Sequence, residues 1–370
     1  MRLQDVFWMR RALQLACLGR GRTSPNPTVG AVVVRDGVEV GCGYHRAAGG
    51  PHAEAEALAR AGELARGATL YVNLEPCDHH GRTPPCTEAV LAAGVRRLVV
   101  AMEDPDPRVR GRGIRRLREA GVEVAVGVLE EEARRLNAAY VKHRTTGLPW
   151  VTCKWAMSVD GRIATRTGAS RWITGPQARE YAHRLRDYHD AVLVGCGTAL
   201  RDDPALTCRL PGGRDPLRVV VDSGAHLPPE ARMLREGSSP VVVATTPRAD
   251  PTRAERLRRA GAEVWVCEPD AGGVSLRDLL RRLAHRGVLS VLAEGGSALH
   301  ASLLQAGLVD RLVAFVAPVV VGGRGAPGPV SGQGVSELVH ALRLEEVTVR
   351  RFGPDLCVEG DVRGRLAVEG

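Results

Sequence analysis

The segment from residue 51 to residue 86 constrains the chain most, because it holds a histidine and two cysteines that can bind one metal ion. His52 stands near its start, and Cys77 and Cys86 follow after a predicted strand. One imidazole and two thiolates give zinc three protein ligands and leave the fourth tetrahedral position open, as catalytic zinc sites do. Glu54 lies two residues after the histidine, where its carboxylate can transfer protons without binding the metal. The segment therefore predicts a catalytic zinc site with Glu54 as its proton carrier.

The order of these residues is typical of zinc deaminases, in which His-x-Glu is followed by Pro-Cys-x-x-Cys. The first half of that pattern is intact, but Cys77 and Cys86 stand nine residues apart, a longer spacing than the general pattern has. Zinc lowers the pKa of its water toward about 7, and a nearby carboxylate can then take and return the proton. The alternative is a surface histidine with two ordinary buried cysteines, and Glu54 beside them favours the metal site.

Helices and short strands alternate through the first part of the chain. The alanine- and leucine-rich segment 53–65 predicts a helix that begins at Pro51 or His52, and Cys86 opens another helix, whose N-terminus favours a thiolate. Further helices are expected at residues 4–18 and 113–120, and strands at residues 29–34, 38–43, 69–74, 97–102 and 122–128. This alternation predicts a three-layer α/β domain.

The loops beside the metal segments carry polar side chains. They can bind a polar heterocycle and its phosphate, or they can simply face solvent. These residues are Asn26, His45, His79, His80, Arg82 and Asp104.

A chain of 370 residues is too long for one typical core, so two domains are expected, at residues 1–146 and 147–370, with a short linker at residues 145–149. In the second domain, strands are expected at residues 150–157, 191–194, 218–221, 241–244, 263–267, 289–293, 311–316, 347–351 and 356–360. Helices are expected at residues 177–187, 253–260, 276–286 and 300–306. The pattern predicts a nucleotide-binding α/β domain with a mostly parallel sheet and an antiparallel edge.

A loop with two glycines, in the segment 293–299, predicts a phosphate site in this second domain. It joins a strand to a helix, where free backbone N–H groups and the helix dipole bind phosphate. The segment 195–197 is a weaker candidate, because it could be a simple turn. No acidic residue is placed to bind a ribose 2′-hydroxyl, so NADP is favoured over NAD, with Ser223, Arg248 or another arginine near the 2′-phosphate. A substrate phosphate in place of a dinucleotide is the alternative.

The formal net charge of +9 comes almost entirely from arginine, since Lys142 and Lys154 are the only lysines. Aromatic residues make up only 4% of the chain and acidic residues run throughout it, whereas nucleic-acid binders concentrate basic residues and often interleave aromatics. The arginines are therefore better explained as solvated surface residues than as a nucleic-acid-binding surface. The positive electrostatic field of the protein would also attract a phosphorylated small molecule.

The sequence contains no run of about 18 apolar residues and no recognisable signal peptide. No membrane partner is expected. The protein is expected to be cytoplasmic, with its thiols reduced. The nine cysteines are odd in number and scattered, which argues against a disulfide framework.

A set of motifs links the sequence to one family. In the first half they are Asn26-Pro27, Gly43-Tyr44-His45, Pro51-His52-Ala53-Glu54, Leu74-Glu75-Pro76-Cys77 and Gly81-Arg82-Thr83-Pro84-Pro85-Cys86. In the second half they are Lys154-Trp155-Ala156-Met157-Ser158-Val159-Asp160-Gly161-Arg162, Trp172-Ile173-Thr174, Asp202-Asp203-Pro204-Ala205-Leu206-Thr207 and Glu294-Gly295-Gly296. On these motifs, which span essentially the whole chain, the sequence resembles the bifunctional deaminase–reductase family of riboflavin biosynthesis. The long Cys77-to-Cys86 spacing is the pattern of this branch.

The resemblance implies two consecutive steps toward riboflavin, with Zn²⁺ and NADPH as cofactors. The expected substrate is 2,5-diamino-6-ribosylamino-4(3H)-pyrimidinone 5′-phosphate. A cytidine-deaminase-like first domain would hydrolyse the 2-amino group. A dihydrofolate-reductase-like second domain would then reduce the ribosyl group to ribityl, giving 5-amino-6-ribitylamino-uracil 5′-phosphate.

The resemblance also assigns residues, beginning with the metal ligands His52, Cys77 and Cys86 and the proton carrier Glu54. Nicotinamide-cofactor contacts fall on Ala156, Trp172, Thr198, Asp202, Ser223, Gly296, Ser297, Ala298, Leu299, His300, Ala301 and Ser302. Substrate contacts of the second domain fall on Ser170, Arg186, Leu206, Arg209 and Glu294.

Three further positions carry expectations of their own. Lys154 is expected to hold a sugar hydroxyl or phosphate, since a compact ammonium reaches into a pocket that is too small for a guanidinium. Asp106 stands where related sequences often have asparagine, which puts its substrate contact in doubt. Arg82 stands where some have lysine, which keeps the charge and alters its geometry.

Two other functions remain open on the sequence. A nucleic-acid-editing zinc deaminase with an accessory binding domain would show salt-dependent RNA or DNA affinity. A single-activity pyrimidine deaminase could instead carry a regulatory nucleotide sensor, although Lys154, Asp202 and Glu294 argue against it. A possible homo-oligomer is compatible with the sequence.

Overall fold

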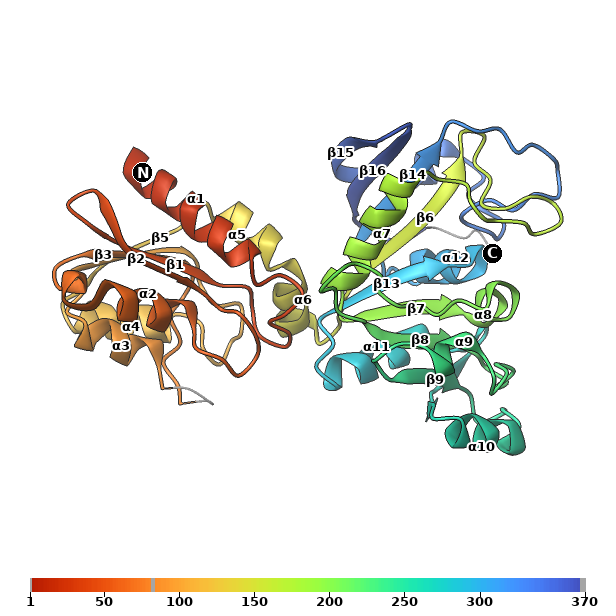
Figure 1. Ribbon diagram of the computed structural model, residues 1–370, viewed down its shortest axis with the longest axis horizontal. Coiled ribbons are helices and arrows are strands. Elements are labelled where there is room, and N and C mark those ends of the chain that lie inside the picture. Colours follow the sequence, from red (N-terminus) through yellow and green to blue (C-terminus); the bar gives the residue numbers. More distant parts are fainter. Residues whose placement is uncertain (1, 81–83, 367–370) are drawn as a thin grey trace. The chain divides into compact units, whose positions relative to one another are not determined.

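The computed structural model describes residues 2–80 and 84–366 and divides into two compact units, Met1–Gly147 and Leu148–Gly370. Each unit has its own sheet and its own core (Figure 1). The two are described separately below.

The first unit is a five-stranded sheet in the order β2-β1-β3-β4-β5. Its strands are β1 (Gly30–Arg35), β2 (Val38–Tyr44), β3 (Thr69–Leu74), β4 (Arg97–Met102) and β5 (Glu123–Val126). β1 and β2 form the expected antiparallel hairpin around Asp36 and Gly37, which adopt the positive φ angles of 51° and 80° that a tight hairpin turn needs. β3, β4 and β5 run parallel to one another, so the ends of β3 and β4 meet at one edge of the sheet.

Helices cover both faces of this sheet, as a three-layer α/β domain requires. α1 (Leu3–Cys17) and α5 (Glu130–Leu136) pack on one face, and α2 (Ala53–Ala61), α3 (Cys86–Ala92) and α4 (Arg112–Glu119) pack together on the other (Figure 1). The core is made of valine, leucine and alanine side chains from β1, β3 and β4 that are almost fully buried. The three-layer prediction is confirmed.

Two helices at the end of this unit differ from the expectation. The sequence predicts no element between residue 128 and the linker, but α5 is followed directly by α6 (Ala138–Thr146). α6 takes up the first two residues of the expected linker, because the hydroxyls of Thr145 and Thr146 donate to carbonyls of the preceding turn at 2.9 and 2.8 Å. Gly147, with φ at 70°, ends the helix.

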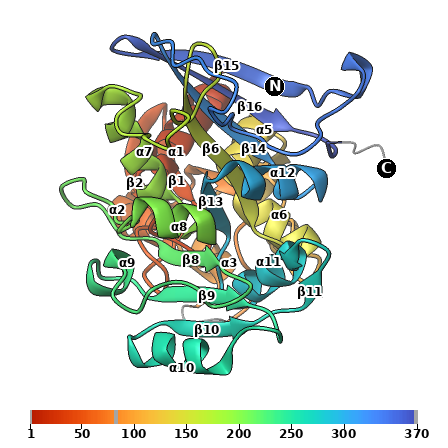
Figure 2. The same ribbon diagram turned by 90° about the vertical axis from the view of Figure 1, so that its right-hand side faces the viewer.

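The second unit is a nine-stranded sheet in the order β10-β9-β8-β7-β13-β6-β14-β16-β15 (Figure 2). The parallel strands are β6 (Trp150–Ser158), β7 (Ala191–Gly195), β8 (Leu217–Val221), β9 (Val241–Thr245), β10 (Glu263–Val266), β13 (Ser290–Gly295) and β14 (Arg311–Ala317). β16 (Asp355–Val362) and β15 (Leu344–Phe352) are antiparallel. The prediction of a mostly parallel sheet with an antiparallel edge is confirmed.

The helices of this unit lie on both faces of the sheet. α11 (Leu276–His285) and α12 (Ser297–Gln305) pack on one face. α7 (Pro176–Tyr188), α8 (Cys196–Asp202), α9 (Arg232–Arg235) and α10 (Pro251–Arg259) pack on the other. The strands β11 (Pro269–Asp270) and β12 (Gly273–Val274) form a small separate hairpin, and Leu338–His340 is a short 3₁₀ helix.

α8 and the start of α12 differ from the expected elements. α8 replaces the simple turn considered at residues 195–197, and α12 begins three residues earlier than predicted. Both helices therefore start directly after a parallel strand, at the edge of the sheet where such folds bind ligands. In the part of the chain that the structure describes, no helix is both long and apolar enough to cross a membrane.

Candidate active sites

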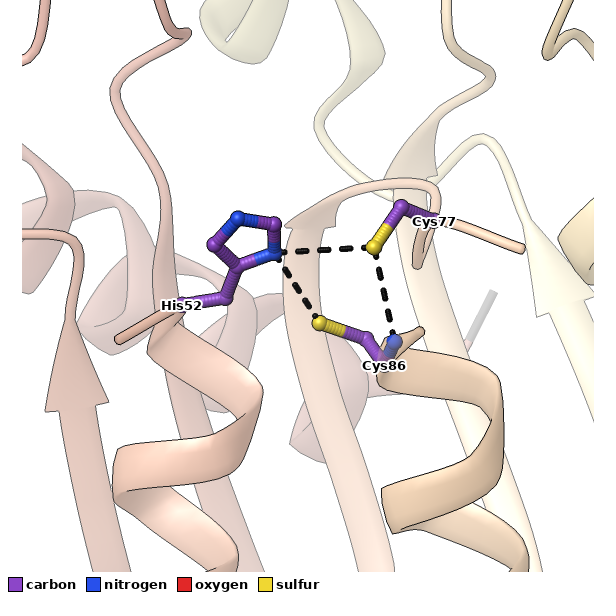
Figure 3. A group of neighbouring side chains, drawn as sticks. All are labelled: His52, Cys77 and Cys86. Carbon is purple, nitrogen blue, oxygen red and sulfur yellow. Dashed lines mark hydrogen bonds between the residues drawn. The ribbon is translucent and has the colours of Figure 1, made fainter. Parts of the chain in front are cut away.

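The three predicted metal ligands converge in the first unit, although they come from three different elements. His52 is the N-cap of α2, Cys77 follows β3, and Cys86 is the first residue of α3. Nδ1 of His52 lies 3.2 Å from Sγ of Cys86 and 3.5 Å from Sγ of Cys77 (Figure 3). In a tetrahedral zinc site, a nitrogen and a sulfur ligand lie roughly 3.5 Å apart. The donor set and its spacing therefore fit zinc.

The electrostatics of the two thiols favour a thiolate at this point. The side chain of Cys86 is the main cause that lowers the pKa of Cys77, to about 4, and His52 adds to the effect while burial opposes it. The backbone N–H of Cys86 also donates to Sγ of Cys77 at 3.4 Å. The pKa of Cys86 is raised, first by its hydrogen bond with Cys77 and then by burial. The lowered pKa favours the thiolate form of Cys77, and thiolate is the form that binds a metal.

Glu54 lies beside this centre, in the first turn of α2, and its side chain is only 4% exposed. Burial is the main cause that raises its pKa to about 7, and the charge of Cys77 adds to the shift. A carboxyl group that titrates near neutral pH can both take up and release a proton in the working range of an enzyme. The position and the pKa of Glu54 fit a general acid–base.

A cavity of about 650 Å³ opens beside this centre. Of the residues predicted from the sequence, it is lined by Asn26, His45, His52, Glu54, Cys77, His79 and Asp104. Cys86 is buried behind the cavity wall with an exposure of 2%. Arg82 lies outside the described residues.

His45 is held rigidly in this wall. Its Nδ1 lies 2.9 Å from the carbonyl oxygen of Pro51 and its Nε2 lies 3.0 Å from Nδ2 of Asn26. Since the Asn26 amide nitrogen can only donate, Nε2 accepts and Nδ1–H donates to Pro51. Burial lowers the pKa of His45, which agrees with this neutral ring.

Asp104 and Asp106 follow β4 and have different partners. Asp104 accepts a hydrogen bond from the Tyr140 hydroxyl at 3.2 Å, and burial raises its pKa. Asp106 is bound by Arg108, whose Nε and Nη2 donate to its two oxygens at 3.0 and 2.7 Å, and these bonds lower its pKa to about 2. Asp106 therefore lines the cavity as one half of an ion pair with Arg108.

Arg108, Tyr140 and Arg144 are among the residues of this wall that the sequence did not single out. Arg144 lies 3.9 Å from Asp106 and over the ring of Tyr140, and its Nε is buried without a hydrogen-bond partner among the described residues. Tyr140 and Arg144 come from α6, a helix that the sequence did not predict. No motif marks them, so no sequence signal was available.

A second cavity, of about 570 Å³, opens in the second unit. The predicted residues that line it are Lys154, Ala156, Ser170, Trp172, Arg186, Thr198, Asp202, Leu206, Arg209, Glu294, Gly296, Ser297, Ala298, Leu299 and His300. Ser223, Ala301 and Ser302 lie outside this lining, and these three assignments stay predictions. The Ser223 hydroxyl contacts the backbone N–H of Val274 at 3.2 Å instead.

A buried charge cluster forms the floor of the second cavity. Arg186 donates from Nε and Nη2 to the two carboxylate oxygens of Glu294 at 2.6 and 2.8 Å, and Nζ of Lys154 lies 3.9 Å from the same carboxylate. Burial raises the pKa of Glu294, but Arg186 and Lys154 outweigh it and bring the pKa down to about 2. Burial lowers the pKa of Lys154, and Glu294 opposes that shift. The cluster thus holds an ionised carboxylate between two cations.

The start of α12 forms a cradle on the wall of this cavity. The backbone N–H of Gly296 donates to Oγ1 of Thr198 at 3.0 Å, and a Cβ at Gly296 would lie only 3.0 Å from that oxygen. Four arginines that the sequence did not single out also line the cavity, namely Arg171, Arg179, Arg201 and Arg232. Arg248, considered for a 2′-phosphate, is exposed and lies outside the described lining. The helix N-terminus and the arginines fit a phosphate-bearing cofactor.

Two family profiles match the chain. The profile "Cytidine and deoxycytidylate deaminase zinc-binding region" matches residues 3–102, and "RibD C-terminal domain" matches residues 149–358. The first match contains the metal centre, and the second contains the charge cluster and the α12 cradle.

Curated relatives and solved structures match nearly the whole chain. The riboflavin biosynthesis protein RibD of Aquifex aeolicus is 43% identical over 355 residues, covering 96% of this chain and 97% of the relative. RibD of Escherichia coli is 42% identical over 369 residues, covering 96% and 99%. The structure of Acinetobacter baumannii RibD is 38% identical with a TM-score of 0.88, covering 98% of this chain and 99% of that one. A Thermotoga maritima diaminohydroxyphosphoribosylaminopyrimidine deaminase/5-amino-6-(5-phosphoribosylamino)uracil reductase is 38% identical with a TM-score of 0.86, covering 97% and 99%.

Proposed function

Because the chain belongs to the RibD family of riboflavin biosynthesis and is a bifunctional deaminase and reductase, we propose how its residues divide the two reactions. Residues 1–146 form the deaminase domain and residues 147–370 the reductase domain. The substrate is 2,5-diamino-6-ribosylamino-4(3H)-pyrimidinone 5′-phosphate, and the product of both steps is 5-amino-6-ribitylamino-uracil 5′-phosphate. The observation that carries the proposal is the convergence of His52, Cys77 and Cys86 beside a buried Glu54 with a pKa of about 7.

In the first reaction, His52, Cys77 and Cys86 hold the zinc, and Glu54 moves the protons. Zinc held by these three residues would supply a water of lowered pKa as the nucleophile. Glu54 accepts a proton from the attacking water and delivers it to the departing ammonia, for which a pKa of about 7 is well matched. The rigid Asn26–His45 pair and Asp104 orient the pyrimidine ring, because the cavity presents these polar groups at fixed positions.

The phosphate of the substrate fits the basic part of the same wall. Arg108 is largely exposed at the rim and neutralises Asp106, while Arg144 offers a buried N–H without a partner among the described residues. We place the ribose phosphate near Arg144 and His79, which line the same cavity, while the contact expected from Arg82 stays a prediction from the sequence. Because Arg108 neutralises Asp106, Arg144 leaves this part of the wall cationic.

In the second reaction, the charge cluster positions the sugar and the α12 cradle holds the cofactor phosphates. NADPH supplies the hydride that reduces the sugar carbon. Glu294, fixed by Arg186, and Lys154 face the cavity and bind the ribose hydroxyls. The N–H groups at the start of α12 and the lining arginines bind the phosphates of the cofactor. The zinc-binding region and the reductase domain fit Zn²⁺ and NADPH as the two cofactors.

The Lys154→Arg variant is expected to lower reductase turnover by at least about tenfold, equivalent to about 1.4 kcal/mol. Nζ of Lys154 lies 3.9 Å from Glu294, whose two oxygens already accept from Arg186, and a planar guanidinium at this position cannot place a compact point charge as an ammonium does. Turnover is measured by NADPH oxidation with deaminated substrate, and deamination should be unchanged. Lys142→Arg, the only other lysine of the chain, is the matched control. Reductase kinetics of Lys154→Arg within twofold of the parent would show that the lysine is incidental.

The nucleic-acid-editing alternative is not favoured. The RibD C-terminal profile covers residues 149–358, where that alternative would place an accessory binding domain. The same match disfavours a regulatory nucleotide sensor. The enzyme acts on a small pyrimidine, while the cytoplasmic location and a homo-oligomer stay predictions. The experiment that tests the proposal is product identification by mass after incubation with the diamino-pyrimidine phosphate, with and without NADPH.

A further inference from the structure

Three side chains of different chemistry converge at the sheet edge of the second unit. Cys196 is the first residue of α8, directly after β7, Asp222 directly follows β8, and His226 is in the turn after it. Their ligand atoms all lie within 4.8 Å of one another. β7 and β8 are parallel neighbours, so the sheet itself brings the thiol and the carboxylate together.

The turn after β8 is built around the Asp222 carboxylate. One oxygen accepts the backbone N–H of Leu227 at 2.7 Å, and the other lies 3.1 Å from Nδ1 of His226. The His226 ring lies directly over Gly224, where a Cβ would approach the ring carbon to 2.0 Å. Glycine at this position is therefore what lets the imidazole reach the carboxylate.

An aspartate that organises its own turn explains the contacts of Asp222 with Leu227 and His226, but it does not explain Cys196. The thiol of Cys196, at the start of α8 directly after β7, lies within 4.8 Å of the same carboxylate. The carboxylate is 1% exposed, whereas the side chain of His226 is 54% exposed. One side of the cluster is thus closed by protein and the other is open to solvent.

We propose that Cys196, Asp222 and His226 form a second metal site, for a divalent transition metal of the zinc class. A thiolate, a carboxylate and a neutral imidazole are ligands that zinc uses, and the two negative charges balance the charge of the ion. Binding displaces the thiol proton of Cys196 to solvent. The open side next to His226 leaves the fourth position to water. Ligand atoms within 4.8 Å need to close only modestly around the ion, and the exposed His226 is free to adjust.

The metal would join the β7–α8 junction to the β8 turn, beside the reductase cavity. The cavity lining includes the residues that flank Cys196, namely Gly195, Gly197 and Thr198. The ion would therefore stabilise this part of the lining. A metal that binds only the folded protein stabilises it by mass action. The expected result is a reductase unit whose unfolding temperature rises when the metal is bound.

The test is zinc stoichiometry of the full-length protein after loading and dialysis, with each site removed in turn. The parent should retain about two zinc ions per chain, and Cys196→Ser and Cys86→Ser about one each, since each loses one three-ligand set. His226→Gln changes an exposed side chain and should lower the affinity for the second zinc ion at least about tenfold. Cys208→Ser is the matched control, because Cys208 is also a half-buried thiol of this unit but belongs to neither group of candidate metal ligands found among the described residues.

Two further readouts distinguish a specific site from loosely bound metal. Cobalt added to protein that carries one zinc should produce thiolate-to-cobalt absorption in the parent and in Cys208→Ser, and none in Cys196→Ser. Zinc should raise the unfolding temperature of the parent and of Cys208→Ser above that of Cys196→Ser. Equal zinc content, cobalt absorption and thermal shift in Cys196→Ser, His226→Gln and the parent would overturn the proposal. If Cys86→Ser loses one zinc ion and keeps the other, the lost ion belongs to the deaminase site. Such a result leaves the site at Cys196 intact.

Discussion

Glu54→Gln is expected to lower the rate of ammonia release by at least about a thousandfold, within the range that a positioned general acid–base contributes. The amide that replaces the carboxylate cannot accept a proton from water or return it to ammonia. Glu54 is buried beside the metal ligands with a pKa of about 7, and no other carboxylate stands in the His-x-Glu motif. Ammonia release is measured with the diamino-pyrimidine phosphate and no NADPH.

Glu56→Gln is the matched control, because Glu56 lies on the same helix but contacts Arg46 and the backbone of Tyr44 outside the metal centre. It should deaminate at close to the parent rate. Glu54→Gln should still oxidise NADPH when it receives substrate that is already deaminated, since its reductase residues belong to the other unit. Loss of both activities in folded Glu54→Gln protein would contradict the division of labour between the units.

Cys86→Ser is expected to lose the zinc of the first unit, a decrease of about one equivalent per chain relative to the parent, and with it deamination. Cys86 is one of the three candidate ligands that the described residues supply, and its buried sulfur lies 3.2 Å from Nδ1 of His52. A serine hydroxyl is a poor zinc ligand, so the remaining imidazole and thiolate bind the ion weakly. The measurement is zinc content after dialysis, followed by ammonia release.

Cys42→Ser serves as the control for the loss of a thiol as such. Cys42 is a half-buried thiol of the same unit, on β2, and lies outside the metal group. This variant should keep the zinc and the activity of the parent. Active Cys86→Ser protein with undiminished zinc would refute the assignment of the ligands.

The sequence predicted the sheets well because their strands are short apolar runs bounded by turn residues. β1 is buried along five of its six residues, and the Asp36-Gly37 turn after it marks the hairpin. The helices α5 and α6 were missed because α5 begins with three glutamates and carries two arginines, which leaves little apolar stripe to detect. α5 packs instead against β3 and β4, and its exposed pair of Arg134 with Glu130 at 2.8 Å adds a small stabilising contact within the helix.

The convergence of His52, Cys77 and Cys86 could be expected from the sequence because all three lie within one segment with a recognisable order, and their role as zinc ligands stays a prediction. The contacts of the second cavity were not predictable as geometry, since Arg186 and Glu294 are 108 residues apart and meet only in the folded sheet. Arg144 reaches the first cavity from α6, which has no motif. These residues line the cavities because of where the fold places them, which their residue types alone do not indicate.

The most direct test of the central claim is the mass of the products formed from the diamino-pyrimidine phosphate in ¹⁸O-labelled water. Without NADPH, one product is expected, in which an amino group is replaced by an oxygen that carries the label. With NADPH, this product is expected to gain two further hydrogens on its sugar chain. A substrate that stays unchanged without NADPH, or that gains the hydrogens while keeping both amino groups, would contradict a zinc deaminase that acts before an NADPH-dependent reductase in one chain.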